Sequence, residues 1–376
     1  MKKALVLLVA FLMVGMSAMA VSAAEWNFYG SARVQTFYVD KEAGDYKALG
    51  TKDSKYLDFK LMDGARLGAR VDVSDTLYGR FEYGHIDGKA ILRLLYGRWD
   101  FGGGKLYVGR MYSPLAMTEG NSVYNGSTNA GYGAVYGGRV EGIKLSFHHE
   151  AYEIGIYDPA AYAKMGDTQE FTWPRIEARF FYPMGNFMPF GGAAYQTYKA
   201  TKTSGAPDAS YGTTKESKID SYILTGGVRY TVGAFYMSAS IWGGQNVNEM
   251  YIWSEEDGGY TQSIARPTYD YYGYGNDVHD TDSIGYFLYG GYILNDTWKF
   301  EAGVSGINSD SDSSRMTQTD KSLNYYIQAI WTLAPGVTIT PEIGVHDGKD
   351  GYAYTDSAYM EEIKFTYFGM KWQISF

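Results

Sequence analysis

The closing residues of the chain, Phe368-Gly-Met-Lys-Trp-Gln-Ile-Ser-Phe376, alternate between large apolar side chains and small or polar ones. Successive side chains of a β-strand point to opposite faces, so this stretch predicts a strand with two different faces. The apolar face carries Phe368, Met370, Trp372, Ile374 and Phe376. The other face carries Gly369, Lys371, Gln373 and Ser375. Such a strand is suited to separate an apolar medium from water.

The same period of two recurs from Trp26 onward, in runs of about ten residues. It turns Arg66 and Arg70 away from the face of Leu67, and the stretches 175–182, 298–305 and 337–346 alternate in the same way. Strands of a soluble β-sandwich also alternate, and packing of the aromatics in a soluble core is the matching alternative. Because the alternating runs are many and follow an export signal, we expect an all-β fold, a transmembrane antiparallel β-barrel.

The N-terminus predicts export. A basic start, Met1-Lys2-Lys3, precedes an apolar run over 4–16 and a segment of small residues over 17–24. This is typical of a secretory signal peptide, residues 1–24, with cleavage after Ala24 or alternatively after Ala20. The other interpretation, a membrane anchor, suits the short apolar run less well. No apolar run of about 18 residues remains in 25–376, so a mature chain in a membrane must form a closed barrel.

Composition narrows the function further. The chain has 376 residues, no cysteine and a net charge of -9, which suits an exported protein without disulfides and argues against nucleic-acid binding. The 37 tyrosines raise the aromatic share to 17%. Tyrosine and tryptophan settle at the boundary between lipid and water. We therefore expect belts of aromatics near the strand ends, formed by Tyr29, Tyr38, Tyr182, Tyr230, Tyr292 and Trp298.

The connections predict the number of strands. Seven short turns are expected near 74–75, 102–104, 149–150, 183–185, 231–233, 295–296 and 334–336. Eight segments, mostly longer and polar, are expected at 40–54, 87–89, 113–137, 159–172, 200–218, 244–282, 309–321 and 347–360. This alternation implies about 16 strands, with both chain ends on the side of the short turns. The tyrosine-rich segment 244–282 is also long enough for an additional hairpin.

The glycine-rich segment 112–137 is the candidate constriction loop. It follows a predicted strand, contains Pro114 and Glu119, and is small enough to fold inward against the barrel wall; an ordinary surface loop is the alternative. A constriction is expected because about 16 strands enclose a lumen too wide for side chains to fill.

At this point the sequence resembles the trimeric general porins of Gram-negative bacteria. The resemblance covers about the first 150 residues. It rests on three stretches in order: Gly64-Ala-Arg-Leu-Gly-Ala-Arg, Leu92-Arg-Leu-Leu-Tyr-Gly and Gly104-Lys-Leu-Tyr-Val-Gly-Arg-Met-Tyr-Ser-Pro. A Gly-Arg pair before the inward loop and Gly-Arg-Val after it match Gly109-Arg110 and Gly138-Arg139-Val140. The aromatic final residue Phe376 likewise resembles the C-terminal assembly signal of outer-membrane barrels.

The resemblance implies a set of constriction residues. Its wall arginines would be Arg66, Arg93 and Arg139, and the opposing acid would be Glu119. Alternation independently turns Arg66 and Arg70 inward and places Arg33 and Arg80 on polar faces, whereas the strand of Arg93 is apolar on both faces. The segment departs from the family, because it lacks the Pro-Glu-Phe-Gly-Gly sequence and a second acid.

Several arginines facing one glutamate predict a transverse field and mild anion preference. The alternative is wall salt bridges of these arginines with Glu82 or Asp72, without an effect on selectivity.

The predicted function is a porin for passive diffusion of small hydrophilic solutes and ions across the outer membrane. The expected partners are lipid and lipopolysaccharide, the barrel assembly machinery and, from the resemblance, two further copies in a homotrimer; the short 87–89 segment weakens the expectation of a trimer. A substrate-specific anion or oligosaccharide channel is the first alternative, and lumenal aromatics would support it (Tyr78, Tyr236, Trp242 and Tyr289). A non-conducting adhesin or enzyme is the second.

The sequence offers little for catalysis or a cofactor. None of its five histidines lies in a recognisable nucleophile motif, so no enzymatic activity is expected. No cofactor is expected either, although acidic outer segments such as Asn308-Ser-Asp-Ser-Asp312 are candidate weak Ca²⁺ sites.

Overall fold

The fold is an all-β barrel, seen here in a computed structural model. The structure describes residues 24–44, 52–86, 88–117, 120–124, 133–160, 168–203, 214–250, 252, 268–269, 278–311, 318–348, 350–352, 359–361 and 363–376. The predicted signal peptide therefore lies outside the described residues, apart from Ala24.

The elements in chain order are strands joined by turns and a single described 3-10 turn within the 246–280 connection. They are β1 (Glu25–Glu42), β2 (Ser54–Leu61), β3 (Arg66–Asp72), β4 (Leu77–Ile86), β5 (Lys89–Asp100), β6 (Lys105–Tyr112), β7 (Arg139–Phe147), β8 (Tyr152–Tyr157), β9 (Thr168–Glu170), β10 (Arg175–Phe181), β11 (Phe187–Thr203), β12 (Thr214–Val232), β13 (Phe235–Gln245), η3 (Val247–Met250), β14 (Thr268–Tyr269), β15 (Val278–His279), β16 (Thr281–Ile293), β17 (Trp298–Ser311), β18 (Gln318–Ala334), β19 (Val337–Asp347), β20 (Asp350–Tyr352), β21 (Tyr359–Glu361) and β22 (Lys364–Ser375).

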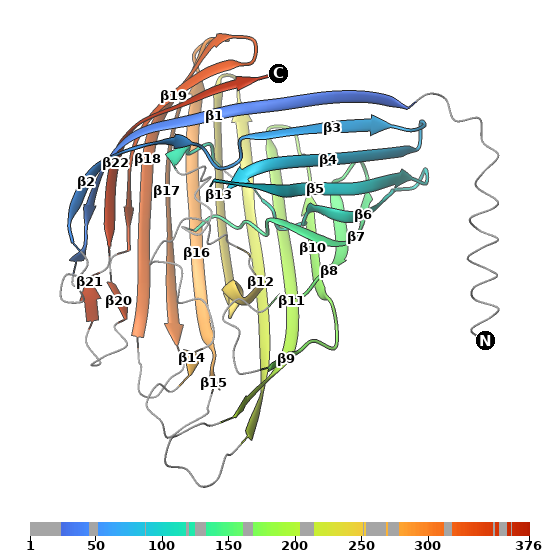
Figure 1. Cartoon of the computed structure of the whole chain (residues 1–376), viewed down its shortest axis with the longest axis vertical. Helices are drawn as coiled ribbons and strands as arrows, with labels where there is room; N and C mark the ends of the chain where they lie inside the picture. The colour runs from blue at the N-terminus through green and yellow to red at the C-terminus, as the bar shows by residue number, and fades with distance from the viewer. Residues whose placement is uncertain are drawn as a thin grey trace.

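The barrel has 16 strand positions, as predicted. Its sheet contains 18 strands, but β2 and β3 both pair with β1, one after the other, and β9 and β10 both pair with β11. Counting each of these two pairs as one interrupted strand leaves 16. Every pairing is antiparallel between chain neighbours, and β22 closes the barrel by pairing with β1 (Figure 1). Gly30 and Phe376 exchange backbone hydrogen bonds of 2.6 and 3.0 Å at this seam.

The connections follow the predicted asymmetry. The seven short turns fall between β3 and β4, β5 and β6, β7 and β8, β10 and β11, β12 and β13, β16 and β17, and β18 and β19. Both ends of the described chain lie on this side, because Glu25 pairs with Asp72 and Ser375 with Ser31. In the described residues of 244–282, the additional hairpin considered above corresponds to the small β14–β15 ladder, which stands outside the barrel sheet.

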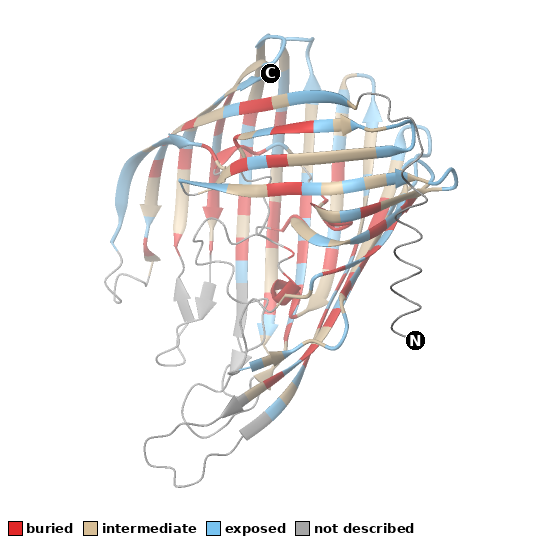
Figure 2. Ribbon diagram, turned by 45° about the vertical axis from the view of Figure 1, so that its right-hand side comes forward, coloured by how far each residue is buried: buried red, intermediate tan, exposed pale blue. Residues whose placement is uncertain are grey.

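The polarity of the wall is the reverse of that of a soluble protein, because apolar side chains face outward and polar ones face inward. Large apolar side chains point outward and are widely exposed, such as Leu57 (66%), Leu224 (68%) and Ile327 (64%), while Gln35 and Asn324 are fully buried inside. Exposed and buried residues alternate along the strands (Figure 2). A soluble protein rarely exposes a continuous apolar surface beyond a few hundred Å², so the soluble sandwich is the wrong alternative.

The C-terminal strand and most of the predicted aromatics take the expected places. Phe368, Trp372, Ile374 and Phe376 are exposed on the outer face. Beside the short turns, Tyr230 packs against Phe187 at 4.6 Å between ring centroids, and Trp298 against Trp331 at 5.1 Å.

The prediction for Tyr29 was wrong. Phe28 is the outward residue at that point of β1, so Tyr29 turns inward, where its hydroxyl donates to Glu82 (2.8 Å).

Candidate functional site

The segment after β6 leaves the wall and runs inside the barrel, as predicted (Figure 1). Its first leg, 113–117, is held against β10. The backbone N–H of Leu115 donates to Glu177 Oε2 (3.2 Å), and Arg179 Nη1 donates to the carbonyl of Pro114 (3.3 Å). Leu115 and Met117 are buried. The interpretation of 112–137 as an ordinary surface loop is therefore wrong for its described residues.

The middle of the segment is fixed by two carboxylates on the far wall. The backbone N–H of Asn121 donates to Glu301 Oε1 (2.8 Å), and its side-chain amide donates to Oε2 (2.6 Å). The backbone N–H groups of Val123 and Tyr124 donate to Glu342 at 2.9 and 3.1 Å. Glu301 and Glu342 are 2% and 4% exposed, so the segment covers both acids. The loop thereby separates their negative charge from the open lumen.

The return leg, 133–138, packs on β13 and β16. Trp242 Nε1 donates to the carbonyl of Gly133 (2.8 Å). Gly133 has a φ of 119°, and a Cβ at this position would lie 2.5 Å from the carbonyl oxygen of Tyr286. Only glycine allows the backbone to approach the wall so closely. Four residues of the wall thus determine the path of the loop: Glu177, Trp242, Glu301 and Glu342.

A second segment also folds inward, which the sequence did not predict. The start of the 246–280 connection, assigned above to an outer loop, contains η3, and Val247, Met250 and Ile252 are completely buried. Arg175 donates to the carbonyl of Met250, and the N–H of Tyr136 donates to the carbonyl of Ile252 (2.8 Å). The first part of 244–282 therefore belongs to the constriction.

The two segments share an apolar cluster with the inner wall. It consists of Leu115, Met117, Val135, Phe190, Ala194, Ile223, Trp242, Val247, Met250 and Ile252. Phe190, Ile223 and Trp242 belong to barrel strands, so part of the inner face is apolar, and Trp242 is one of the lumenal aromatics named above. The cluster covers the inner face of β11–β13. The side formed by β1 and β3–β6, which contributes no residue to it, is called the free side or free wall.

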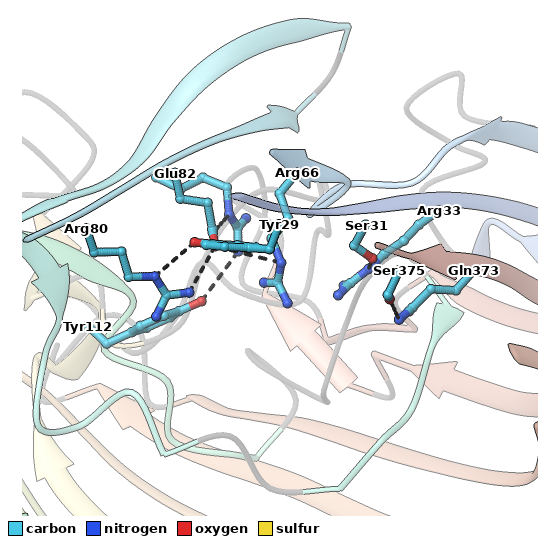
Figure 3. A network of polar contacts seen from close by, with 10 residues as sticks. Tyr29, Ser31, Arg33, Arg66, Arg80, Glu82, Tyr112, Gln373 and Ser375 are labelled. Atoms are coloured by element: carbon cyan, nitrogen blue, oxygen red, sulfur yellow. Dashed lines mark hydrogen bonds and ion pairs between the residues drawn. The ribbon is translucent and has the colours of Figure 1, made fainter. Parts of the chain in front are cut away.

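Arginines gather on that free side around one acid. Glu82, fully buried, accepts from Arg93 Nε (2.7 Å) and Arg80 Nη2 (3.2 Å), and Arg66 Nε lies 3.8 Å away (Figure 3). The proposed alternative of wall salt bridges with Glu82 is therefore correct in geometry. Three guanidinium groups share one carboxylate, which leaves an excess of two positive charges.

The inward direction of Arg93 has a specific cause. Glu82 pairs with Leu94 and Tyr83 with Leu92, so Arg93 is an additional residue in β5, a β-bulge. A bulge breaks strict alternation, and Arg93 and Leu94 are both buried on the inner side. A Cβ on Gly84 of the neighbouring strand β4 would lie 2.1 Å from Arg93 Cδ, so the glycine makes room for the arginine.

Further cations extend the basic wall toward β22. Arg33 Nε donates to Ser31 Oγ (2.9 Å), and Lys371 pairs in register with Gln35. Neither cation lies within 4.0 Å of a carboxylate in the part of the chain that the structure describes. The Arg139 guanidinium stands 5.7 Å from the ring centre of Tyr112, whose hydroxyl accepts from Arg93 at 3.4 Å. The predicted opposing acid, Glu119, lies outside the described residues.

The structure does not bring all six predicted arginines into one ring. Arg33, Arg66, Arg93 and Arg139 surround the entry to the loop. Arg80 bridges to this group through Glu82 and also lines a cavity on the turn side, whose wall includes Arg70, four residues nearer the short turns than Arg66.

No metal or helical membrane span is found in the described part of the chain. It contains no cluster of three or more His, Cys, Asp or Glu side chains placed to hold a metal ion. The acidic segment 308–312, a candidate Ca²⁺ site, is described only as far as Ser311. Among the described residues, no helix is long and apolar enough to cross a membrane.

Comparisons with known proteins agree on the architecture. No family model matches the chain, and no curated protein matches it in sequence. The outer membrane channel DcaP of Acinetobacter baumannii superposes with a TM-score of 0.66 at 16% identity, covering 94% of this chain and 97% of that one. The trimer form of OmpT, an outer membrane protein of Vibrio cholerae, gives 0.61 at 13%, with 94% and 100% covered. The anion-selective porin from Comamonas acidovorans gives 0.60 at 14%, with the same coverage. The chain therefore has the closed 16-stranded barrel fold of outer-membrane porins.

Proposed function

We propose that the protein is a water-filled channel for passive diffusion of small hydrophilic solutes across the outer membrane, with a preference for anions. The observation that supports it is the unequal distribution of charge across the constriction. Glu177, Glu301 and Glu342 are covered by the inward segments. Arg33, Arg66 and Lys371 stand on the free wall.

This arrangement favours anions for an electrostatic reason. The inward segments cover the carboxylates of Glu177, Glu301 and Glu342 and donate backbone hydrogen bonds to them, so these acids do not meet a passing ion directly. The cations of the free wall carry an excess of two charges around Glu82, and Arg33 and Lys371 add two more. In a narrow passage, such fixed charges raise the local concentration of ions of opposite sign.

Export and assembly follow from the ends of the chain. Residues 1–24 would direct secretion and be removed, and the outer face of β22 would present the C-terminal assembly signal to the barrel assembly machinery. The apolar outer face would contact lipid, and the acidic outer segments would meet lipopolysaccharide. A homotrimer is the proposed assembly, in keeping with the trimer form of the Vibrio cholerae protein.

Planar-bilayer recording of the purified protein tests the proposal. We expect step-like conductance and a reversal potential in a KCl gradient that indicates chloride preference. Strong cation selectivity would contradict the anion preference, and block by a single sugar would favour an oligosaccharide channel. Absence of any conductance by a folded barrel would favour the adhesin or enzyme alternative.

A pair of variants connects the selectivity to the free wall. The double variant Arg33→Gln, Arg66→Gln removes two charges and should shift the reversal potential toward the cation side. Lys89→Gln, at the exposed β4–β5 hairpin, removes one positive charge away from the passage. A shift in Lys89→Gln about half as large as that of the double variant would show that the overall charge, rather than the constriction, sets selectivity.

A further inference from the structure

A separate basic cavity lies between the constriction and the short turns. It has a volume of about 720 Å³, and its wall includes Arg70, Tyr78, Arg80, Tyr96, Arg98 and Tyr107. Asp72 and Glu150, at or beside short turns, also line it, which places it on the turn side of the Glu82 cluster. We name it the turn-side cavity.

Cations exceed acids in this cavity. Five cationic side chains and three acidic ones line it, so two positive charges are in excess. Lys144 and Arg179 each lie 2.9 Å from Glu153, and Arg80 contacts Glu82. Among the residues that the structure describes, no carboxylate lies within 4.0 Å of Arg70 or Arg98. These two guanidinium groups are therefore the lining cations that a bound anion could contact without displacing a carboxylate.

The backbone register forces like charges together. Arg70 and Arg80 are direct cross-strand partners on β3 and β4, and both lie near the ring of Tyr29, at 5.6 and 5.2 Å from its centre. Like charges placed directly opposite one another destabilise a sheet. A bound anion would offset this repulsion, whereas a structural role alone would be served better by a neutral partner.

Tyrosines and cations also alternate across four neighbouring strands. Tyr78, Arg98, Tyr107 and Lys144 are successive partners across β4, β5, β6 and β7. The Arg98 guanidinium stands 4.4 Å from the ring centre of Tyr78, and Lys144 Nζ 4.8 Å from that of Tyr107. These cation–π contacts hold the charges beside the rings instead of letting them extend into water.

The three tyrosine rings form a continuous array. Tyr96 lies between Tyr78 and Tyr107, with ring centroids 6.2 and 5.8 Å apart. Tyrosine offers a large, rigid contact area that a flat apolar group can stack against. The cavity thus places an aromatic surface next to two guanidinium forks, and planar guanidinium groups match the geometry of a carboxylate.

We propose that the turn-side cavity is a binding site for small aromatic monocarboxylates. The carboxylate would contact Arg70 and Arg98, and the ring would lie against Tyr96, which stands between Tyr78 and Tyr107. That such solutes also cross the barrel rests on the proposed channel function, but binding itself does not. A barrel that binds them without conducting would support this site and contradict the channel.

Titration calorimetry on the folded protein in detergent tests the site with three probes. Benzoate carries both ring and charge, benzamide keeps the ring without the charge, and acetate keeps the charge without the ring. We expect benzoate to bind at least about tenfold more tightly than either, because benzamide lacks the charge-assisted hydrogen bonds and acetate lacks the contact with the tyrosine rings. Equal affinity for benzoate and benzamide, or for benzoate and acetate, in the unmodified protein would overturn the proposal.

Two variants assign the two halves of the site. Arg98→Gln should remove most of the advantage of benzoate over benzamide, and Tyr96→Leu should remove most of its advantage over acetate. Lys89→Gln is the matched charge control and should bind benzoate like the unmodified protein. Unchanged benzoate affinity in a folded Arg98→Gln protein would contradict the assignment. If a variant fails to fold, the comparison of the three probes on the unmodified protein still tests the site.

Discussion

Glu342 of β19 accepts hydrogen bonds from the backbone N–H groups of Val123 and Tyr124, which are more than 200 residues distant in sequence. The same carboxylate accepts from the hydroxyls of Ser122 (3.3 Å) and Tyr367 (3.1 Å). Four donors converge on one buried acid, and Tyr124 then stacks on Tyr367 at 4.1 Å between ring centroids. The acid therefore fixes the tip of the constriction loop to the seam of the barrel.

Glu342→Gln should loosen this attachment without removing side-chain volume. The amide nitrogen cannot accept, so at least one buried donor would lose its partner, at a cost of about 1–3 kcal/mol. We expect greater noise in the open-channel current and a lower free energy of unfolding in detergent. Glu25→Gln, an exposed acid at the start of β1, is the control. Quiet recordings identical to those of the unmodified channel would show that Glu342 does not hold the loop.

The barrel could be predicted from the sequence because its rule is local. Each strand must present an apolar face to lipid, so a period of two is visible in every segment without knowledge of its partners. The seven short turns could also be predicted, because each is a local interruption of this period of two. The interruptions between β2 and β3 and between β9 and β10 are not visible in the pattern, because they change the pairing of the wall and not its polarity.

The site could be predicted only in part because its contacts join distant segments. Alternation placed Arg66 and Arg70 inward, but the bulge at Arg93 shifts the alternation by one residue, and only the partner strand reveals it. Glu301 and Glu342 were expected on the polar face, yet nothing local distinguishes an acid that receives a loop from an acid exposed to water. One weak signal was available in the sequence, the run of apolar residues Val247, Met250, Ile252 and Trp253 at the start of a mostly polar connection.

Gly133→Ala should displace the return leg of the loop. The residue has a positive φ, and the new methyl group would lie 2.5 Å from the carbonyl oxygen of Tyr286. Such a backbone conformation costs about 1–3 kcal/mol for a residue with a side chain. We expect a lower thermal stability and an altered single-channel conductance. Gly97→Ala is the control, because Gly97 has open space around the added carbon and is absent from the positive-φ glycines. Equal effects of the two variants would contradict the role of Gly133.

Arg175→Met should release the second inward segment. Arg175 is buried, donates to the carbonyl of Met250 and lies 3.0 Å from Glu177. Removing one partner of a buried ion pair costs about 3–5 kcal/mol. We expect lower stability together with a larger conductance, measured by unfolding in detergent and by bilayer recording.

The double variant Arg175→Met, Glu177→Leu separates these two effects. It removes both members of the ion pair, so part of the stability should return, less the contribution of the hydrogen bond from Leu115 to Glu177, which is also lost. The conductance should stay high, since the contact with Met250 and the attachment of Leu115 are both absent. A conductance that returns to the original value together with the stability would show that the segment is not held by Arg175.

The contacts of Glu150 predict that the turn between β7 and β8 stabilises the protein at neutral pH but not at low pH. Burial alone would raise the pKa of this carboxyl, but the Tyr107 hydroxyl (2.7 Å) and the Lys105 ammonium (3.0 Å) hold it below the ordinary value of 4.5. A lowered pKa in the folded state stabilises the protein above about pH 4.5, and the contribution is lost as the pH falls through the folded-state pKa. Unfolding of Glu150→Gln should therefore require less denaturant than unfolding of the unmodified protein at pH 7, and the difference should shrink at pH 3. Asp75→Asn in the β3–β4 turn is the control, and a difference for Glu150→Gln that persists at pH 3 would indicate a steric effect in place of the carboxylate contacts.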